Sequence, residues 1–326
     1  MYKVSVIVPI YKVEAFIARC VDSLMSQTLE EIEFVFVDDC SPDDSILILK
    51  NTLLKYPFRK PHTRIITHNQ NKGLPSARNT GLAVVSGEYV YHCDSDDYLE
   101  PSMLKDMYLA AVSDNTEIIY CDWYLSFDKN ERYMRQREYI NVDECVKGLL
   151  SGGLRFNVWN KLVKRSLYNN YQITFPSGYS MGEDMTMIML FACANKIKHL
   201  RQAGYHYIKL NTNSYTQTIS ERYWIDIKHN VERVSNFIRK HCGDRYIKEL
   251  YFLQLDVKLS LLFTGDITKY DLWNRTYPEA NEFILQNKNV SIRYRLLQWC
   301  AYKKQYWLLN LYFHCVHKIV YGIIFK

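Results

Sequence analysis

The chain has 326 residues, of which 48% are hydrophobic and 23% are charged, and this balance excludes a disordered chain, a collagen-like repeat and a coiled coil. The formal net charge is +6, from 41 basic and 35 acidic residues. Segment 290–326 holds six basic and no acidic residues, so the rest of the chain is balanced and charge does not indicate nucleic-acid binding by the main body.

The cysteines and the N-terminus indicate the compartment. Nine cysteines are scattered along the chain without C-x-x-C spacing, which argues against a disulfide framework or a structural zinc site and favours a reducing environment. The N-terminal apolar run is too short for a signal peptide, and no small-residue cleavage site follows it. We therefore expect a cytoplasmic protein.

The first third of the chain alternates between short apolar runs and segments with helical spacing. We expect strands at 3–8, 33–37, 64–67, 89–93 and 117–121, and helices at 14–26, 41–55, 76–85 and 101–112. Pro9 is expected to end the first strand, and Ser41 followed by Pro42 suits the start of the second helix. This alternation predicts an α/β fold with a doubly wound, mostly parallel sheet flanked by helices.

After about residue 125 the pattern loosens. A strand, a helix and a second strand are expected at 171–175, 184–195 and 197–208, and mainly helices follow residue 219. The predicted organisation is a first domain with two halves and a helical C-terminal region. These parts are residues 1–215, divided into a nucleotide half (1–122) and an acceptor half (123–215), and residues 216–326.

Acidic residues follow two of the expected strands. Asp38 and Asp39 end the second strand, and the run D-S-D-D at 94–97 ends the fourth. Carboxylates gathered at one sheet edge would repel each other, so a hard divalent cation with oxygen ligands is a simple counter-charge. A single strand-end acid is more often a helix cap or a turn former, as we expect for Asp97.

Four motifs in order resemble those of the family 2 glycosyltransferases. They are KVSVIVPIY at 3–11, VDDxSxD at 37–43, NxGxxxARNxG at 71–81 and SGEYVxxxDSDDYLxP at 86–101. The resemblance is dense over residues 1–122 and extends more thinly to about residue 215. It implies a GT-A fold and an inverting hexosyltransferase that moves a sugar from a nucleoside diphosphate sugar to a saccharide hydroxyl, in cell-surface polysaccharide synthesis.

The resemblance implies a donor site at the positions that match these motifs. The implied donor-binding residues are Pro9, Tyr11, Glu14, Asp39, Gly73, Arg78, Asp94 and Ser95. Asp39 matches the carboxylate that accepts the imide N–H of the base, which favours a UDP-sugar. Tyr11 would pack against the base or in the core, and Arg78 would brace the carboxylates or form an ion pair on a helix surface.

Asp94 and Asp96 match the D-x-D motif of the family. Residues i and i+2 of an extended segment point the same way, so both carboxylates can reach one ion. The resemblance implies Mg²⁺ or Mn²⁺ here, with Asp96 in direct contact and Asp94 at the metal or the ribose. The cation would act as a Lewis acid and stabilise charge on the departing diphosphate.

An inverting transfer also needs a base on the opposite face of the sugar. Asp184, in SMGEDMTM at 180–187, matches the base of the family's E-D pair, although acids are common in a first helical turn. On the acceptor side the resemblance implies Trp159, Lys161 and Glu183. Trp159 belongs to a W-N-K-L element and could equally be a core residue.

Segment 290–326 is basic and rich in Trp and Tyr. Its polar residues recur at three- or four-residue spacing between 303 and 321, which leaves a wide apolar face that is too interrupted for a membrane-spanning helix. Such a face fits the surface of an anionic inner membrane, where a lipid-linked acceptor would be presented. Packing on the protein's own core or against a second copy in a homodimer fits it equally well.

Two rival functions stay open. A sugar nucleotidyltransferase would share the strand-end acids but needs a basic, Gly-rich phosphate loop after the first strand, which PIYKVEA at 9–15 lacks. A catalytically silent sugar-nucleotide-binding protein would not need Asp94, Asp96 and Asp184 together.

Overall fold

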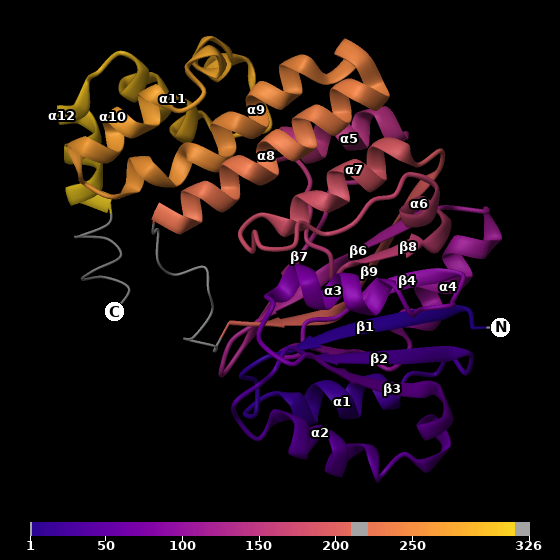
Figure 1. Cartoon of the computed structure of the whole chain (residues 1–326). Helices are drawn as coiled ribbons and strands as arrows, with labels where there is room; N and C mark the ends of the chain where they lie inside the picture. Colours follow the sequence, from indigo (N-terminus) through magenta and orange to yellow (C-terminus); the bar gives the residue numbers. More distant parts are fainter. Residues whose placement is uncertain (1, 210–220, 317–326) are drawn as a thin grey trace. The chain divides into compact units, whose positions relative to one another are not determined.

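The structure, a computed structural model, describes residues 2–209 and 221–316 and divides into two compact units (Figure 1). Unit 1 comprises Met1–Asp143 and Phe156–Val234, and unit 2 comprises Glu144–Arg155 and Ser235–Lys326. The domain boundary expected at residue 215 falls outside the described residues, so that boundary stays a prediction.

Unit 1 is built on a mixed sheet with the strand order β3-β2-β1-β4-β8-β6-β9-β5, and β7 pairs with β6. The strands are β1 (Val4–Ile10), β2 (Ile32–Asp38), β3 (Thr63–Thr67), β4 (Tyr89–His92), β5 (Tyr98–Leu99), β6 (Ile118–Ser126), β7 (Glu131–Met134), β8 (Lys161–Lys164) and β9 (Ile197–Ile208). Strands β1 to β4 are parallel, β8 runs antiparallel between β4 and β6, and β6 is parallel to β9.

Helices cover both faces of this sheet, as the fully buried strands β1 and β2 require. In unit 1 they are α1 (Ile17–Met25), α2 (Ser45–Leu53), α3 (Leu74–Leu82), α4 (Met103–Ser113), α6 (Arg165–Asn170) and α7 (Thr186–Cys193). Helix α3 packs on β1 and β2, while α1 and α2 lie on the opposite face (Figure 1). Gly81 permits the close packing of α3, since a Cβ there would come 2.4 Å from Ile7 Cγ2. The predicted α/β fold class is confirmed.

Two expected boundaries were wrong. Strand β1 continues through Pro9 to Ile10. Its pairing with β4 ends at Ile7, so the N–H that Pro9 lacks would have had no hydrogen-bond partner in β4. Helix α2 begins at Ser45 rather than after Ser41. The Ser41 hydroxyl instead accepts a hydrogen bond from the Lys12 N–H and donates one to Asp43, which extends the loop.

The strand expected at 171–175 was also wrong. This segment is a loop, and the strand beside β4 is β8. The Asn79 side chain pairs with both backbone groups of Phe175, donating to its carbonyl and accepting from its N–H at 2.8 Å each. A side chain of α3 thus supplies the bonds that a neighbouring strand would have made, while the expected helix and second strand are present as α7 and β9.

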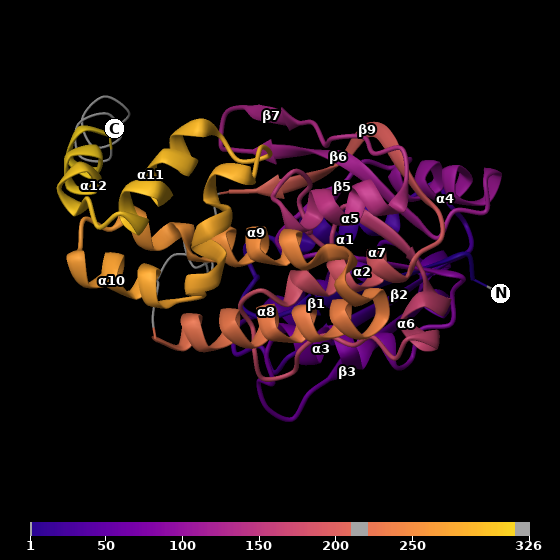
Figure 2. The ribbon, with the colours of Figure 1, turned by 90° about the horizontal axis from the view of Figure 1, so that it is seen from above.

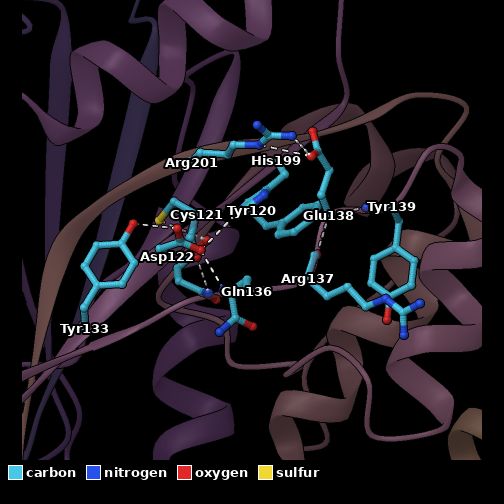
Figure 3. Close-up of polar contacts among 11 residues, drawn as sticks. Tyr120, Cys121, Asp122, Tyr133, Gln136, Arg137, Glu138, Tyr139, His199 and Arg201 are labelled. Atoms are coloured by element: carbon cyan, nitrogen blue, oxygen red, sulfur yellow. Dashed lines mark hydrogen bonds and ion pairs between the residues drawn. The ribbon is translucent and has the colours of Figure 1, made fainter. Parts of the chain in front are cut away.

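A buried polar cluster fixes the segment 131–139 against β6 and β9 (Figure 3). Asp122 accepts hydrogen bonds from the Tyr133 hydroxyl at 2.6 Å, the Gln136 N–H at 2.6 Å and the His199 ring at 2.9 Å. At the exposed end of the cluster Arg201 forms an ion pair with Glu138. All three partners of Asp122 come from outside β6, so this one carboxylate joins three segments of unit 1.

Unit 2 is helical, as predicted for the C-terminal region. Its elements include α9 (Ile247–Lys258), α10 (Ile267–Arg275), α11 (Ile292–Tyr302) and α12 (Tyr306–Tyr312), with 3₁₀ turns at Leu259–Phe263 and Pro278–Gln286. Helix α11 packs against α10 and α12 (Figure 2). Two helices cross the boundary between the units. Helix α5 (Val142–Leu150) begins in unit 1 and continues in unit 2, and α8 (Glu221–Cys242) likewise begins in unit 1 and ends in unit 2.

Lys258 is a fully buried cation in unit 2. Its ammonium donates to the carbonyls of Trp273, Thr276 and Tyr277 and to the side chain of Asn281, and it lies 4.0 Å from the Trp273 ring centroid. Among the described residues no helix is both long enough and apolar enough to cross a bilayer. Residues 317–326 of the predicted amphipathic tail lie outside the described residues.

Candidate active site

The site is built around Arg78, a residue of α3 that is only 1% exposed. Its Nη2 donates to Asp94 Oδ1 at 3.0 Å, directly after β4. Burial lowers the pKa of Arg78, but the charges of Asp94, Asp184 and Glu183 outweigh burial and hold it above its ordinary value. One guanidinium therefore serves both predicted acidic groups, the D-x-D run and the E-D pair.

Several polar atoms in this region are buried and have no protein partner in the part of the chain that the structure describes. They are Arg78 Nε, Arg78 Nη1 and Asp184 Oδ1. A buried donor or acceptor without a partner costs about 1–3 kcal/mol and calls for an explanation. The open donors of Arg78 suit an anionic group, and the open acceptor of Asp184 suits a hydroxyl. A ligand that carries both groups would complete the site.

Helix α8 and a left-handed glycine position the E-D pair. Gly182 directly precedes the short 3₁₀ helix Glu183–Met185. Its φ is 84°, a backbone conformation in which a residue with a side chain would be strained. The Asp226 carboxylate accepts the N–H groups of Ser180 and Met181, at 3.0 and 3.4 Å. Both bonds come from the part of α8 within unit 1, so the loop that carries the two acids is fixed from behind.

The two acids of the pair have different protonation tendencies. Burial, together with the charge of Asp184, raises the pKa of Glu183 to about 8. Burial also raises the pKa of Asp184, but Arg78 opposes the rise and the value reaches only about 6. Near neutral pH these two shifts leave about one proton on the pair, and the charge of Arg78 favours the ionised form of Asp184.

The D-S-D-D run at 94–97 forms a turn tied to β9. The Asp94 side chain is 26% exposed, Asp96 is half-buried, and Ser95 is buried. Asp97 was expected to cap this turn, but that expectation was wrong. Its carboxylate accepts the Ile208 N–H at 2.7 Å and the Tyr205 hydroxyl at 2.5 Å, so it anchors the run to the neighbouring strand.

The carboxylates of this run fit a divalent cation in donor type. Mg²⁺ in proteins commonly takes one or two carboxylates and completes its shell with water and substrate phosphates. Among the described residues Arg78 engages only Oδ1 of Asp94, so Oδ2 is left for such a ligand. Within the described ranges no group of three or more His, Cys, Asp or Glu side chains is arranged to hold a metal ion by itself.

Asp39, at the end of β2, organises the loop that leads into α3. Its carboxylate accepts the His68 ring N–H at 2.6 Å and the N–H groups of Lys72 and Gly73 at 2.8 Å each. Gly73 has φ of 85° and is the N-cap residue directly before α3, and a Cβ there would lie 3.4 Å from Ser180 Oγ. The NxG motif thus brings this loop close to the segment that carries the E-D pair.

The other predicted donor residues lie after β1. Pro9 is buried within the strand, Tyr11 is half-buried just beyond it, and Glu14 is exposed. The Glu14 carboxylate accepts the Asp44 N–H at 3.1 Å, and the Glu14 N–H donates to Asp43 at the same distance. In this structure Glu14 therefore fixes the loop before α2.

On the predicted acceptor side Trp159 and Lys161 are both almost fully buried. The Trp159 ring stacks on Tyr205 at 4.5 Å and on Tyr207 at 5.5 Å between centroids. The Lys161 ammonium donates to the Asn157 carbonyl and to Asn160, and its charge lowers the pKa of Asp184. Lys161 thus acts on the predicted base through its charge.

Tyr205 and Tyr207 were not among the predicted site residues. Burial and the charges of Asp97 and Asp94 raise the pKa of Tyr207 to about 12, so its half-buried hydroxyl lies near the acidic run. Tyr205 contacts the same run through Asp97. The available signal was the i, i+2 spacing of two tyrosines in one strand, which places both on the same face.

Comparison with known proteins decides the family. The model described as "Glycosyl transferase family 2" matches residues 5–183, more than half of the chain. The chain belongs to glycosyl transferase family 2. The matched segment contains Arg78, the acidic run and Glu183, and it ends one residue before Asp184.

This family 2 chain is 32% identical over 222 residues to the "uncharacterized glycosyltransferase EpsJ" of Bacillus subtilis, covering 66% of this chain and 63% of EpsJ. It is 31% identical over 213 residues to the poly(ribitol-phosphate) beta-glucosyltransferase of Bacillus spizizenii, covering 63% of this chain and 32% of that one. The chain thus spans less than two thirds of the length of these relatives.

Among solved structures, S. aureus TarS 1-349 in complex with UDP-GlcNAc superposes with a TM-score of 0.69. The match covers 97% of this chain and 92% of that chain at 21% sequence identity. At this identity the likeness concerns the fold, and it confirms the GT-A-type architecture predicted for the family 2 chain.

Proposed function

We propose that this chain is an inverting glycosyltransferase that moves a hexosyl group from a UDP-sugar to a hydroxyl of a saccharide acceptor, in the synthesis of a cell-surface polysaccharide. The observation that carries this proposal is the position of Arg78, which is buried, forms an ion pair with Asp94 and interacts electrostatically with Glu183 and Asp184. The family assignment and the UDP-GlcNAc bound to TarS support the same reaction class.

The donor would bind at the carboxyl ends of β1, β2 and β4. We assign it Pro9, Tyr11, Glu14, Asp39, Gly73, Arg78, Asp94 and Ser95. Asp39 would accept the imide N–H of uracil, and the loop at Gly73 lets the backbone approach the nucleotide. The two open donor nitrogens of Arg78, Nε and Nη1, would meet the anionic part of the donor.

Asp94 and Asp96 would hold Mg²⁺ or Mn²⁺ together with the donor diphosphate. When bound, such a cation supplies Lewis-acid stabilisation of the charge that grows on the leaving group. Arg78 braces Asp94 from the protein side, which fixes one carboxylate oxygen and leaves the other available.

Asp184 would act as the base of a single displacement. The acceptor hydroxyl attacks the anomeric carbon, Asp184 Oδ1 takes the hydroxyl proton, and the nucleoside diphosphate leaves with the bonding electrons of the glycosidic C–O bond. Positioned general-base help contributes roughly 10²–10⁴-fold in rate. Glu183, which retains its proton near neutral pH, can donate a hydrogen bond to the acceptor without adding negative charge. Trp159 and Lys161 would shape the acceptor side behind it.

We further propose that unit 2 contacts the cytoplasmic surface of an anionic membrane, where a lipid-linked acceptor would be presented. Four large apolar side chains, Ile292 and Leu296 on α11 and Trp307 and Leu311 on α12, are 52–66% exposed. Arg293, Lys303 and Lys304 are exposed on the same two helices and their connection, and no acidic residue lies in 290–326. Within 290–326 the exposed apolar groups are accompanied by cations and by no acidic residue, which suits an anionic interface.

The reaction class is tested with a panel of nucleotide sugars and Mn²⁺, by thermal stabilisation and by release of the nucleoside diphosphate. We expect UDP-sugars to stabilise the protein and to release UDP. Stabilisation without UDP release, even with a panel of saccharide acceptors, would favour a silent binding protein. Formation of pyrophosphate from UTP and a sugar 1-phosphate would instead identify a nucleotidyltransferase.

A further inference from the structure

The carboxylate of Asp39 is held from behind by a histidine that no motif singled out. His68 follows β3, and its side chain is 5% exposed. Its Nδ1 lies 2.6 Å from Asp39 Oδ1, and its Nε2 lies 2.9 Å from the Thr80 hydroxyl on α3. Both ring nitrogens therefore have partners, and the ring is fixed between β2 and α3.

The hydrogen-bond partners of His68 determine which of its ring nitrogens carries the proton. Asp39 also accepts the N–H groups of Lys72 and Gly73, so it acts as an ionised acceptor. A bare Nδ1 facing that carboxylate at 2.6 Å would set two acceptors against each other. The Nδ1–H form avoids this, and Nε2 can then accept the Thr80 hydroxyl.

The same count shows which lone pair of Asp39 stays open. Oδ1 accepts two donors, from His68 and Lys72, which fill its two lone pairs. Oδ2 accepts only the Gly73 N–H among the described residues, so it keeps one lone pair. His68 thus fixes the rotation of the carboxylate and leaves one acceptor position on one oxygen.

We infer that His68, held in its Nδ1–H tautomer between Asp39 and Thr80, is a positioning residue that makes the Asp39 site selective for a base with an imide N–H. This inference rests on the proposed function, in which Asp39 contacts the nucleobase. Uracil offers an N–H at N3 and pairs with the open lone pair of Oδ2. Cytosine offers a lone pair at N3 and meets a second acceptor, so the site should prefer UDP over CDP.

The test measures UDP and CDP binding by calorimetry to the full chain and to a matched pair of variants. In His68→Asn the amide nitrogen takes the place of Nδ1 and keeps a donor to Asp39. In His68→Gln the amide sits at the Nε2 position, so Asp39 Oδ1 loses its side-chain donor and keeps only the Lys72 N–H. We expect His68→Gln to weaken UDP binding roughly tenfold and to reduce the preference for UDP over CDP by a similar factor, while His68→Asn stays close to wild type.

A general loss of folding would lower the affinity for UDP and for CDP by the same factor and would leave the ratio of the two affinities unchanged. A change in this ratio therefore distinguishes a positioning role of His68 from a purely structural one. A wild type that prefers UDP, with the same preference in His68→Gln, would overturn the inference alone. A wild type that binds neither nucleotide would overturn the proposed function and this inference with it.

A second measurement determines the tautomer of His68 in the wild type, where the contact with Asp39 is intact. Long-range ¹H–¹⁵N correlation spectra of the wild type report the tautomer of each histidine, and the His68 signals are identified by their absence in His68→Asn. We expect the Nδ1–H form. An Nε2–H form would overturn the inference, because Asp39 could then not be oriented by a donor from His68.

Discussion

At the scale of single residues, the different environments of Glu183 and Asp184 give each acid its proposed task. Both are partly buried next to the same arginine, but Glu183 also bears the charge of its neighbour, and its pKa rises further. The Glu183–Asp184 pair therefore holds one proton and one negative charge near neutral pH. This arrangement predicts how activity depends on pH.

The pH–rate profile of UDP release should be bell-shaped. Below about pH 6 Asp184 gains a proton and the rate should fall about tenfold per pH unit, and above about pH 8 Glu183 loses its proton and adds a second negative charge. Glu183→Gln should remove the alkaline limb and keep the acid limb. An acid limb near pH 4, the ordinary range of an aspartate, would contradict the proposed base.

How much of the site the sequence predicts depends on the kind of signal each residue carries. Asp94, Arg78 and the E-D pair belong to motifs, and the structure brings these charged groups together. Asp97 was misassigned because its partners, Tyr205 and the Ile208 N–H, come from a strand more than one hundred positions away. Motif spacing describes local geometry, and it cannot report a contact made by the folding of distant strands.

At the scale of elements, the same distinction explains which strands were predicted. The buried parallel strands β1 and β2 are continuous apolar runs, so their positions were clear from sequence. Strand β8 has only four residues, two of them lysines, and forms because β4 and β6 bind its two edges. Its pairing partners, rather than its own composition, determine that it is a strand.

The cluster around Asp122 predicts a stability difference within one small region (Figure 3). Asp122→Asn should lower the free energy of unfolding by about 2–3 kcal/mol, because a buried acceptor of three hydrogen bonds is replaced by a group with only one acceptor oxygen. Glu138→Gln breaks only the exposed pair with Arg201 and should cost under about 1 kcal/mol.

Urea unfolding of both variants measures this difference. Equal effects of Asp122→Asn and Glu138→Gln, or no effect of either, would contradict the view that Asp122 joins β6, β7 and β9. Because the Asp122 cluster contains none of the proposed donor-binding or catalytic residues, wild-type affinity for UDP is expected in both variants while they remain folded.

At the scale of the whole molecule, the basic, apolar surface on α11 and α12 predicts where the protein works. The chain should co-sediment with vesicles that contain phosphatidylglycerol and not with neutral vesicles, and salt should weaken this binding. Trp307→Ser combined with Leu311→Ser should reduce binding at least tenfold, since both side chains would insert their apolar area into the interface.

Phe58→Ser supplies the matched control, because Phe58 is 62% exposed and Trp307 is 63% exposed, but Phe58 lies in unit 1. It should leave vesicle binding unchanged. A stable homodimer in solution that the Trp307 and Leu311 changes dissolve, without any vesicle binding by the wild type, would show that this surface joins two copies instead.

The central claim is that the acids around Arg78 form the centre of a sugar transfer, with Asp184 taking the acceptor proton. The most direct test compares Asp184→Asn with the wild type, measuring UDP binding by calorimetry and turnover of a UDP-sugar by UDP release. The account predicts that UDP affinity stays within about threefold while turnover falls by roughly 10²-fold or more. A variant that binds UDP and turns over at the wild-type rate would contradict it.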